Sequence, residues 1–455
     1  MTMLEEFCPG WQENGLTIHS FYRYTYNGHH MLLNPEYGTT LFLENKLKEL
    51  IQPGHITENL AFLLVQRGMA SYDHSRRPQQ IHHPQFPHFF MLDLTQNCNL
   101  NCLYCFRDLS SKPICMSDDM LLKICNHLIA YWSRHPEIHL HIQAWGGEPL
   151  LQVDQIAMIR RAFDEVGMNP NIEIETNGTL IDEQIAKQLK ELRIHIGVSI
   201  DGDPVVQNQQ RPTLGGKPTS EKVESGIQSL HKFYGDEFGS ITVVTKNTAA
   251  RLYEILDYFV NTLHLTGIKF NPLRETGDYG QLSLSEAELA EFEKKLLEAL
   301  VSYVKSGAKI TEQNICQRLR NLVYRPCNNI CNSCGCQGGY AMVTIDHNGD
   351  VYPCEMSDFP DMRIGKINVD LIENMVNIPD DNTNRYFAPR EFVQCKECPW
   401  HFYCRGGCKS ASIFSTGHTQ AIDKAECVIN RTLYPLLIQL LMEEPEIAAK
   451  LMGNA

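Results

Sequence analysis

Between Phe89 and Gly307 the chain alternates short apolar segments with longer segments of helical periodicity. The apolar segments are HFFMLDLT, HLHIQAWG, NIEIETN, HIGVSID, SITVVT and GIKFNPL. The helical segments include MLLKICNHLIAYW, EQIAKQLKEL, RLYEILDYFVNTL and SEAELAEFEKKLLEALVSYV. Strand–helix units in series predict a parallel α/β sheet, because each helix carries the chain back to begin the next strand in the same direction. We expect closure into a barrel or partial barrel over residues 89–309, with an open doubly wound sheet as the rival.

The regions on either side follow other patterns. Residues 1–75 contain the strand-like segments IHSFYRYTY, HMLLNP and TTLFLEN, and the Asn27-Gly28 turn between the first two is typical of a β-hairpin. Two helical stretches, NKLKELIQ and TENLAFLLVQRGMA, complete a small α+β unit. Residues 76–88 have the composition of a linker. Residues 310–455 have little regular pattern before a helix predicted from Val428 to Leu451.

Charge and hydropathy exclude two classes of partner. The formal net charge is −14 and the chain has no cluster of Lys and Arg, so nucleic acid is not an expected partner. No apolar run reaches about 18 residues, the length of a transmembrane helix, so no membrane partner is expected. The acidic start MTMLEEFCPGW lacks the basic beginning and apolar core of a signal peptide. We therefore expect a cytoplasmic protein.

The 17 cysteines are numerous for a cytoplasmic chain, because stable disulfides are rare in that compartment. Three lie in the stretch CNLNCLYC and eleven lie between Cys316 and Cys427, a clustering that favours metal ligation. Cys98, Cys102 and Cys105 follow the first predicted barrel strand, so their loop should lie at the strand-end face that carries chemistry in such folds. Structural zinc takes four ligands, whereas three soft thiolates in one loop suit a 4Fe–4S cluster with one iron left open.

The stretch CNLNCLYC resembles the C-x3-C-x-Φ-C motif of radical S-adenosylmethionine (radical SAM) enzymes, with Tyr104 as the aromatic residue. The elements WGGEPL, ETNGT and SIDG, at successive predicted strand ends, extend the resemblance. It implies a partial (β/α)6 barrel and a cluster whose open iron binds SAM, which is then cleaved to a 5′-deoxyadenosyl radical. Glu148 lies in the element that receives the SAM amino group, and Asp201 has the alternative of capping the following turn. The residues implied to bind the cofactor are Tyr104, Gly146, Gly147, Glu148, Pro149, Asn177, Ser199, Asp201 and Arg211.

A second cysteine motif lies in the C-terminal region. The pattern C-x2-C-x5-C-x3-C begins at Cys395, and CQGGYAMVTIDHNGDVYPC precedes it. This arrangement resembles the seven-cysteine SPASM extension of radical SAM enzymes, which implies two auxiliary 4Fe–4S clusters and three clusters in all. One auxiliary cluster would be held by Cys336, Cys354, Cys408 and an upstream cysteine, and the other by Cys395, Cys398, Cys404 and Cys427.

The upstream ligand of the first auxiliary cluster is left open by the sequence. Cys316, Cys327, Cys331 and Cys334 all precede the motif, and Cys334 also fits the gap allowed for Cys336. Cys331 is favoured, with Cys327 next. Because zinc ribbons use similar Cys-x2-Cys pairs, a non-catalytic Fe–S or zinc-binding protein is an alternative.

Glu355 directly follows Cys354. In anaerobic sulfatase-maturating relatives the matching position holds a proton-accepting aspartate, so the resemblance makes Glu355 a candidate catalytic base beside a substrate radical. The alternative is a carboxylate in a surface turn. Tyr279, Tyr340 and Tyr403 are candidate hydrogen donors or substrate contacts, with core packing as the alternative.

The layout of residues 1–75, strands followed by helices ahead of the barrel, resembles the winged-helix-like, PqqD-like recognition element of peptide maturases. The resemblance implies that this unit binds the leader of a ribosomally made precursor peptide as an added strand at its sheet edge. An unrelated capping domain is the alternative.

Together these resemblances imply a radical SAM/SPASM enzyme that modifies a ribosomally synthesised precursor peptide, beginning with hydrogen abstraction from a Cα or Cβ position. The family outcomes are a carbon–carbon crosslink such as a cyclophane, a thioether, an epimerisation, or excision of a tyramine-like backbone unit. An anaerobic sulfatase maturase that forms formylglycine is the alternative. The expected partners are the precursor peptide, a flavodoxin- or ferredoxin-type electron donor and, as an option, a separate recognition protein.

Overall fold

The computed structural model describes residues 3–43, 50–72, 86–107, 114–273, 279–324, 330–331, 335–357, 359–375, 386, 390 and 392–453. Most of the predicted linker, the first part of the predicted helical stretch NKLKELIQ, and both Cys327 and Cys334 lie outside these residues. No described helix combines the length and the apolar character that crossing a membrane would require.

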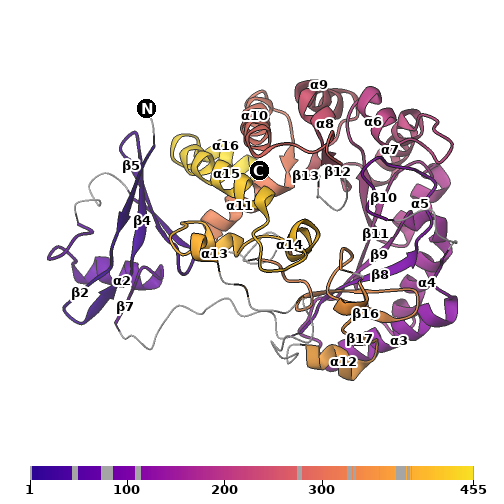
Figure 1. Cartoon of the computed structure of the whole chain (residues 1–455), viewed down its shortest axis with the longest axis horizontal. Coiled ribbons are helices and arrows are strands. Elements are labelled where there is room, and N and C mark those ends of the chain that lie inside the picture. The colour runs from indigo at the N-terminus through magenta and orange to yellow at the C-terminus, as the bar shows by residue number, and fades with distance from the viewer. Residues whose placement is uncertain are drawn as a thin grey trace.

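Seven parallel strands of the described chain lie side by side in the order in which they occur in the sequence (Figure 1). They are β8 (Phe89–Thr95), β9 (His141–Gly146), β10 (Asn171–Thr176), β11 (Ile194–Ser199), β12 (Gly239–Val244), β13 (Gly267–Pro272) and the short β14 (Thr311–Glu312). The helices between and after them are α3 (Asp118–Arg134), α4 (Val153–Asp164), α5 (Glu183–Glu191), α6 (Pro204–Gln210), α7 (Ser220–Tyr234), α8 (Lys246–Ala250), α9 (Leu252–Asp257) and α10 (Glu286–Lys305).

This strand order decides between the two predicted architectures. Right-handed connections between strands in chain order place every helix on one face, whereas a doubly wound sheet requires the order to reverse. In Figure 1 helices α3, α4, α5 and α7 lie along the outside of the curved sheet. The predicted partial barrel is therefore confirmed, and the doubly wound alternative is wrong.

Residues alternate along the barrel strands between an apolar and a polar environment. Phe90 and Leu92 of β8 belong to the large apolar core that the strands share with the outer helices. The opposite face carries charged groups, since Glu175 of β10 interacts with Gln143 of β9 and with Lys269 of β13. Because the helices cover the outside, this polar face lines the inside of the curved sheet.

The cysteine-rich C-terminal region extends the same sheet. β15 (Met342–Ile345) pairs in parallel with β8, and β16 (Asp350–Tyr352) and β17 (Gly365–Lys366) continue the sheet with antiparallel pairs. The other helices of this part are α11 (Gln313–Tyr324), α12 (Val369–Asn374), α13 (His401–Cys404), α14 (Lys409–Thr416), α15 (Lys424–Glu443) and α16 (Pro445–Leu451). The single helix predicted from Val428 to Leu451 is thus two helices, because Pro445 disfavours a helical conformation at Glu444.

The N-terminal unit contains two small antiparallel sheets and one described helix. One sheet has the order β1 (Leu4–Cys8), β4 (Phe21–Tyr26), β5 (His29–Asn34), β6 (Thr39–Leu43). The other contains β2 (Trp11–Glu13), β3 (Leu16–Ile18) and β7 (Ala70–Ser71), and α2 (Glu58–Gln66) starts after the N-cap Thr57. Asn27 and Gly28 form the predicted hairpin turn, with positive φ angles of 45° and 81°. Strand β1 escaped prediction because it lies at the sheet edge, where its side chains are largely exposed and show no alternation.

Aromatic stacking fixes the N-terminal sheet on the cysteine-rich region. The buried Tyr24 ring of β4 stacks on Trp400, with ring centroids 5.6 Å apart, and Trp400 stacks in turn on Tyr434 of α15 at 4.8 Å. Tyr403 Oη donates a hydrogen bond to Gly38 O at 2.8 Å. A Cβ atom at Gly38 would lie 2.0 Å from the Phe402 ring, so this close approach needs glycine. The N-terminal unit is therefore part of one packed structure.

We expect Tyr24→Ala to lower the free energy of unfolding by about 3–5 kcal/mol, as loss of a large buried aromatic ring does. The measurement is urea unfolding followed by tryptophan fluorescence, which reports on the four tryptophans, Trp400 among them. Phe42→Ala is the matched control, because Phe42 of β6 is 41% exposed and should change stability little. Equal effects of the two substitutions would contradict the assigned packing.

Candidate functional site

The loop 98–105 lies at the carboxyl end of β8, beside the ends of β9, β10 and β11. Backbone hydrogen bonds pair it with the segment that follows α6. Asn101 N donates to Pro212 O at 2.8 Å, and Leu103 N donates to Gln210 O at 3.0 Å. The loop is therefore held at the end of β8, which it follows, and by the segment around the end of α6. These two attachments fix the positions of its cysteines.

The GGEP element at the end of β9 fits directly against the backbone that precedes the cysteine loop. Gly147 N donates to Thr95 O at 2.8 Å, and Glu148 N donates to Asn97 O at 2.9 Å. A Cβ atom at Gly147 would lie 2.3 Å from Asn97 O, and one at Gly146 would lie 2.4 Å from Thr95 O. Both glycines are thus required by close backbone contact.

The Glu148 carboxylate is buried, with 1% of the residue exposed, and accepts three hydrogen bonds. Its donors are Leu150 N at 3.1 Å, Thr176 Oγ1 at 2.7 Å and Asn177 N at 2.8 Å. Burial raises the pKa of Glu148, and these hydrogen bonds oppose that rise. The next residue, Pro149, opens a short 3-10 turn. Glu148 therefore joins the end of β9 to the end of β10.

Asn177 links the end of β10 to the first cysteine. Its Nδ2 donates to Asn99 Oδ1 at 2.8 Å and lies 3.9 Å from Cys98 Sγ. Its Oδ1 accepts from Thr179 Oγ1 at 2.6 Å. Ser199 ends the neighbouring strand β11. These predicted residues thus come together at one edge of the sheet.

Asp201 is the centre of a buried network beneath the cysteine loop. It is fully buried, and its Oδ2 accepts from Tyr104 Oη, from Gln210 Nε2 at 2.9 Å, and pairs with Arg211 Nε at 3.1 Å. Its Oδ1 accepts from Val243 N at 3.1 Å. Asp201 therefore anchors the loop through Tyr104 instead of capping the turn that follows it.

The three thiols of the loop are near enough to influence one another's protonation. Burial is the main cause that raises the pKa of Cys98 and that of Cys102, the latter to about 12. The neighbouring Cys105 makes a smaller contribution to both rises, because adjacent thiolates repel. Such thiols remain protonated at neutral pH until a metal displaces the proton. Three clustered soft ligands in a closed backbone frame fit an iron–sulfur cluster.

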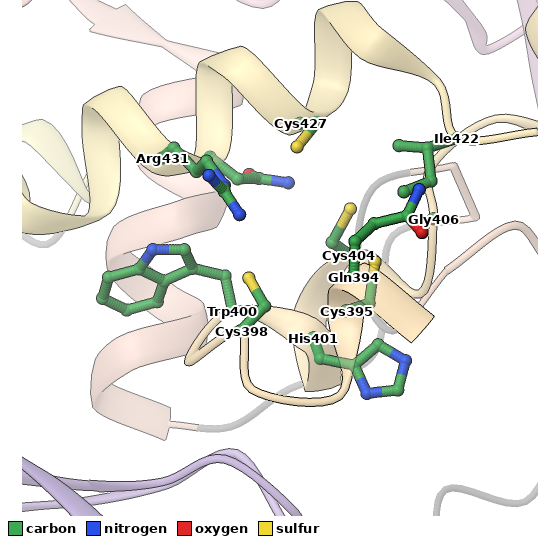
Figure 2. A pocket seen from close by; sticks show the side chains of 11 residues that line it. Gln394, Cys395, Cys398, Trp400, His401, Cys404, Gly406, Ile422, Cys427 and Arg431 are labelled. Carbon is green, nitrogen blue, oxygen red and sulfur yellow. The ribbon is translucent and has the colours of Figure 1, made fainter. Parts of the chain in front are cut away.

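A second set of four cysteines surrounds a cavity between α13 and α15 (Figure 2). The sulfurs of Cys395, Cys398, Cys404 and Cys427 face a common space whose empty volume is about 390 Å³, part of it open to solvent. Trp400, Asn430 and Arg431 also line it. Four soft thiol donors that face one space fit an iron–sulfur cluster.

A third set of cysteines lies against the inner face of the barrel. Cys354 is buried beside Met91 of β8 and near Trp145 of β9. The sulfurs of Cys331 and Cys354 each lie within electrostatic range of those of Cys336 and Cys408. Cys331 is exposed as a residue, yet its sulfur lies among these groups and has its pKa raised to about 12 by burial. This set includes the predicted upstream ligand Cys331, whereas Cys316 lies elsewhere, with its sulfur 3.6 Å from Met452 O.

The candidate base Glu355 lies beside this third set, close to Cys331 and Cys354. The tyrosines predicted as hydrogen donors lie in different places. Tyr279 Oη donates to Cys105 O at 3.3 Å, whereas Tyr403 is buried in the aromatic stack that docks the N-terminal unit. Tyr340 lies under the Lys409 ammonium, 5.4 Å from its ring centroid.

Several residues of the site carry no motif and were missed from the sequence. Tyr386 is fully buried and its hydroxyl lies 3.1 Å from Cys336 Sγ, while Ser410 Oγ lies 3.1 Å from Cys354 Sγ. On the inner barrel face, burial and, to a smaller extent, the Glu175 carboxylate raise the pKa of Glu173 to about 7. The only sequence signal for Glu173 and Glu175 was their alternation with isoleucines in NIEIET.

Two family models match the chain. The model of the radical SAM superfamily matches residues 92–259. The model of the SPASM iron–sulfur cluster-binding domain matches residues 336–399. The first match contains the loop 98–105 and the ends of β9, β10 and β11, and the second contains Cys336, Cys354, Cys395 and Cys398.

Known proteins resemble the chain in sequence and fold. A cysteine-type anaerobic sulfatase-maturating enzyme of Clostridium perfringens is 28% identical over 334 residues, which cover 69% of this chain and 86% of the relative. The solved structure of anSMEcpe with bound AdoMet superposes with a TM-score of 0.66 and 25% identity, covering 80% of this chain and 98% of that one. The structure of Streptococcus suis SuiB bound to precursor peptide SuiA has a TM-score of 0.55 and 15% identity, covering 88% and 96%.

Asp201→Asn should lower the free energy of unfolding by about 3–5 kcal/mol, because it leaves the buried Arg211 guanidinium without a counter-charge. The measurement is urea unfolding of the metal-free protein. Asp203→Asn is the matched control: it weakens the ion pair with Arg251, whose side chain is 36% exposed, and should cost about 0–1 kcal/mol. A negligible effect of Asp201→Asn would contradict the network.

Proposed function

Because this chain belongs to the radical SAM superfamily and carries a SPASM iron–sulfur cluster-binding domain, we propose that it modifies a ribosomally synthesised peptide by radical chemistry. The observation that carries the proposal is the N-terminal β unit packed on the cysteine-rich region, next to a barrel with a polar inner face. Radical SAM chemistry needs a cluster, SAM and a substrate held away from water, and the proposal assigns a part of the chain to each.

Cys98, Cys102 and Cys105 would hold the SAM-binding 4Fe–4S cluster at the strand-end face. When bound and reduced, this cluster and SAM supply a 5′-deoxyadenosyl radical, which removes a hydrogen atom from the substrate. The protein's own contribution is to position these groups. Glu148, Asn177 and Ser199 lie at consecutive strand ends around the loop, where they would contact SAM.

The network of Tyr104, Asp201 and Arg211 would affect SAM binding mainly by holding the cysteine loop in position. The Asp201 carboxylate is engaged by protein donors on both oxygens, and Arg211 lies over the Tyr104 ring, 5.4 Å from its centroid. This network holds the loop that carries Cys102 and Cys105. Gly146 and Gly147 have no side chain, which already allows close backbone contact with Thr95 and Asn97. The same lack of a side chain would let the cofactor approach the backbone here.

The two C-terminal cysteine sets would hold auxiliary 4Fe–4S clusters, giving three clusters in the chain. Cys331, Cys336, Cys354 and Cys408 form the set at the inner barrel face, and Cys395, Cys398, Cys404 and Cys427 form the set around the cavity. The auxiliary clusters supply one-electron acceptors beside the substrate. Glu355, next to the inner set, would accept the proton that leaves the substrate radical at its carboxylate.

The N-terminal sheet offers an edge for a peptide leader. No described strand pairs with β1 on the side away from β4, and Leu4 and Phe7 are 66% and 54% exposed there. An extended leader added at this edge would gain backbone hydrogen bonds and apolar contacts. The polar inner face of the barrel, with Gln143, Glu175 and Lys269, could then satisfy the amide groups of the peptide core. A flavodoxin- or ferredoxin-type protein would deliver the electron.

Sulfatase maturation is the second candidate function. It is favoured by the 28% identity to the Clostridium perfringens sulfatase-maturating enzyme and by the fold shared with anSMEcpe. Both candidates act on a polypeptide and use the same cofactors. They differ in the substrate, which would be a cysteine or serine of a sulfatase in place of a short precursor peptide.

Cys102→Ala should abolish SAM cleavage, because the cluster would lose one of its three thiolates. The measurement is 5′-deoxyadenosine formed under dithionite in anaerobic reconstituted protein. Cys115→Ala is the matched control, since Cys115 is an exposed cysteine whose sulfur is 3.3 Å from Asn97 Nδ2, close to the loop but outside the motif. The wild type should contain about twelve irons per chain with matching sulfide. Cleavage retained by Cys102→Ala would refute the assignment, and about four irons plus zinc would refute the auxiliary clusters.

Co-expression with the short peptide encoded nearest to the gene should change that peptide, as read by tandem mass spectrometry. Loss of two hydrogens would indicate a crosslink or oxidation, an unchanged mass with altered stereochemistry an epimerisation, and a larger loss an excision. With Glu355→Gln we expect SAM cleavage to persist while oxidised peptide falls at least tenfold, because general-base catalysis contributes about 10²–10⁴-fold. Formylglycine in a co-expressed sulfatase, with the peptide unchanged, would favour the second candidate.

A further inference from the structure

The two auxiliary cysteine sets are joined by a short link in the chain, residues 404–408. Cys404 at one end belongs to the cavity set, and Cys408 at the other end belongs to the inner set. Between them Gly406 and Gly407 have φ angles of 83° and 75°. A Cβ atom at Gly406 would lie 2.1 Å from the Phe392 ring, so the link passes through a place where only glycine fits.

One half-buried arginine, Arg390, holds this link in place. Arg390 Nη1 donates to Gly407 O at 2.9 Å, and its Nη2 donates to Gly406 O at 3.0 Å and to Ala421 O at 2.8 Å. Its guanidinium carbon lies 4.9 Å from the centroid of the Phe392 ring. Its Nε is buried and has no hydrogen-bond partner among the described residues. The guanidinium is thus fixed at the midpoint of the link, with one donor unused.

Arg390 also carries its charge close to both cysteine sets. Burial lowers the pKa of the guanidinium, and the thiolates of Cys336, Cys408 and Cys404 oppose that change. Cys336 and Cys408 belong to the inner set, and Cys404 belongs to the cavity set. Arg431 differs, because it lines the cavity of one set only. Its charge opposes the rise in the pKa of Cys395 and Cys427, which both belong to that set.

Arg390 is placed next to the two proposed clusters, whose negative charge would increase on reduction. Uptake of one electron from a reductant by either auxiliary cluster lowers the net charge of that cluster by one, and no proton has to move. A fixed positive charge and hydrogen-bond donors near the sulfurs favour the reduced state, since these are the levers by which a protein tunes an iron–sulfur potential. Because Arg390 lies between the sets, its charge acts on both.

We propose that Arg390 is a positioning residue that raises the reduction potentials of both auxiliary clusters together and holds the link between them in place. The inference rests on the proposed binding of two auxiliary clusters. Because one charge acts on both clusters, the loss of that charge would lower both potentials in the same direction.

The test is a redox titration of the reconstituted full-length chain without peptide, followed by electron paramagnetic resonance. The two auxiliary signals are assigned with Cys354→Ser and Cys427→Ser, one from each set. In Arg390→Gln the reduction equilibrium of both clusters should shift at least tenfold toward the oxidised state, about 59 mV for a one-electron couple. Arg431→Gln is the matched control and should shift only the cavity-set cluster.

Arg390→Lys separates charge from hydrogen-bond geometry, because lysine keeps the charge but cannot reproduce the planar fork. Both equilibria should stay within threefold of the wild type, and this variant also serves if Arg390→Gln loses its clusters. Equal, large shifts in Arg390→Lys and Arg390→Gln, or a shift of one cluster alone in Arg390→Gln, would overturn the inference. Iron analysis keeps the two proposals apart: about four irons would remove the auxiliary clusters themselves, whereas about twelve irons with unshifted potentials would remove only the role of Arg390.

Discussion

The Asp201 carboxylate is the interaction on which the catalytic end of the barrel depends. It is fully buried at the end of β11 and holds Tyr104 of the cysteine loop, Gln210 of α6 and Arg211 in one network. Three ligands in a loop of eight residues have no regular structure of their own to keep them in place. A buried charged network under the loop supplies that rigidity, because breaking the Asp201–Arg211 pair leaves a buried charge without its partner.

The other parts of the chain are arranged in layers around that end. The barrel's outer face is covered by its own helices, while its inner face meets the inner cysteine set through Met91 and Trp145. The cavity set lies in the same C-terminal region as the inner set, and the N-terminal sheet packs against it through the stacking of Tyr24 on Trp400. Under the proposed function, substrate specificity would therefore depend on groups from all three regions, although SAM would bind within one.

The barrel and its site were largely predictable because both leave periodic or motif signals in the sequence. Alternating apolar segments predicted the strands. The glycines of the predicted GGEP element, Gly146 and Gly147, lie where an added Cβ atom would come within 2.4 Å and 2.3 Å of a backbone oxygen. Strand β1 and the break at Glu444 were missed, since an exposed edge strand shows no alternation and a helix break depends on one proline. Arg390 and Tyr386 were beyond prediction, because each meets its cysteine neighbours only through the fold.

The stacking of Tyr24 on Trp400 has a consequence for biosynthesis. Trp400 lies in the chain between Cys398 and Cys404, so the surface on which the N-terminal sheet packs is made by residues that are synthesised long after the sheet itself. The N-terminal sheet must therefore wait, partly undocked, until the segment around Trp400 has been synthesised. Under the proposed function, iron supply would then act as an assembly checkpoint, because a chain without its clusters would lack the ordered surface that holds its N-terminal unit.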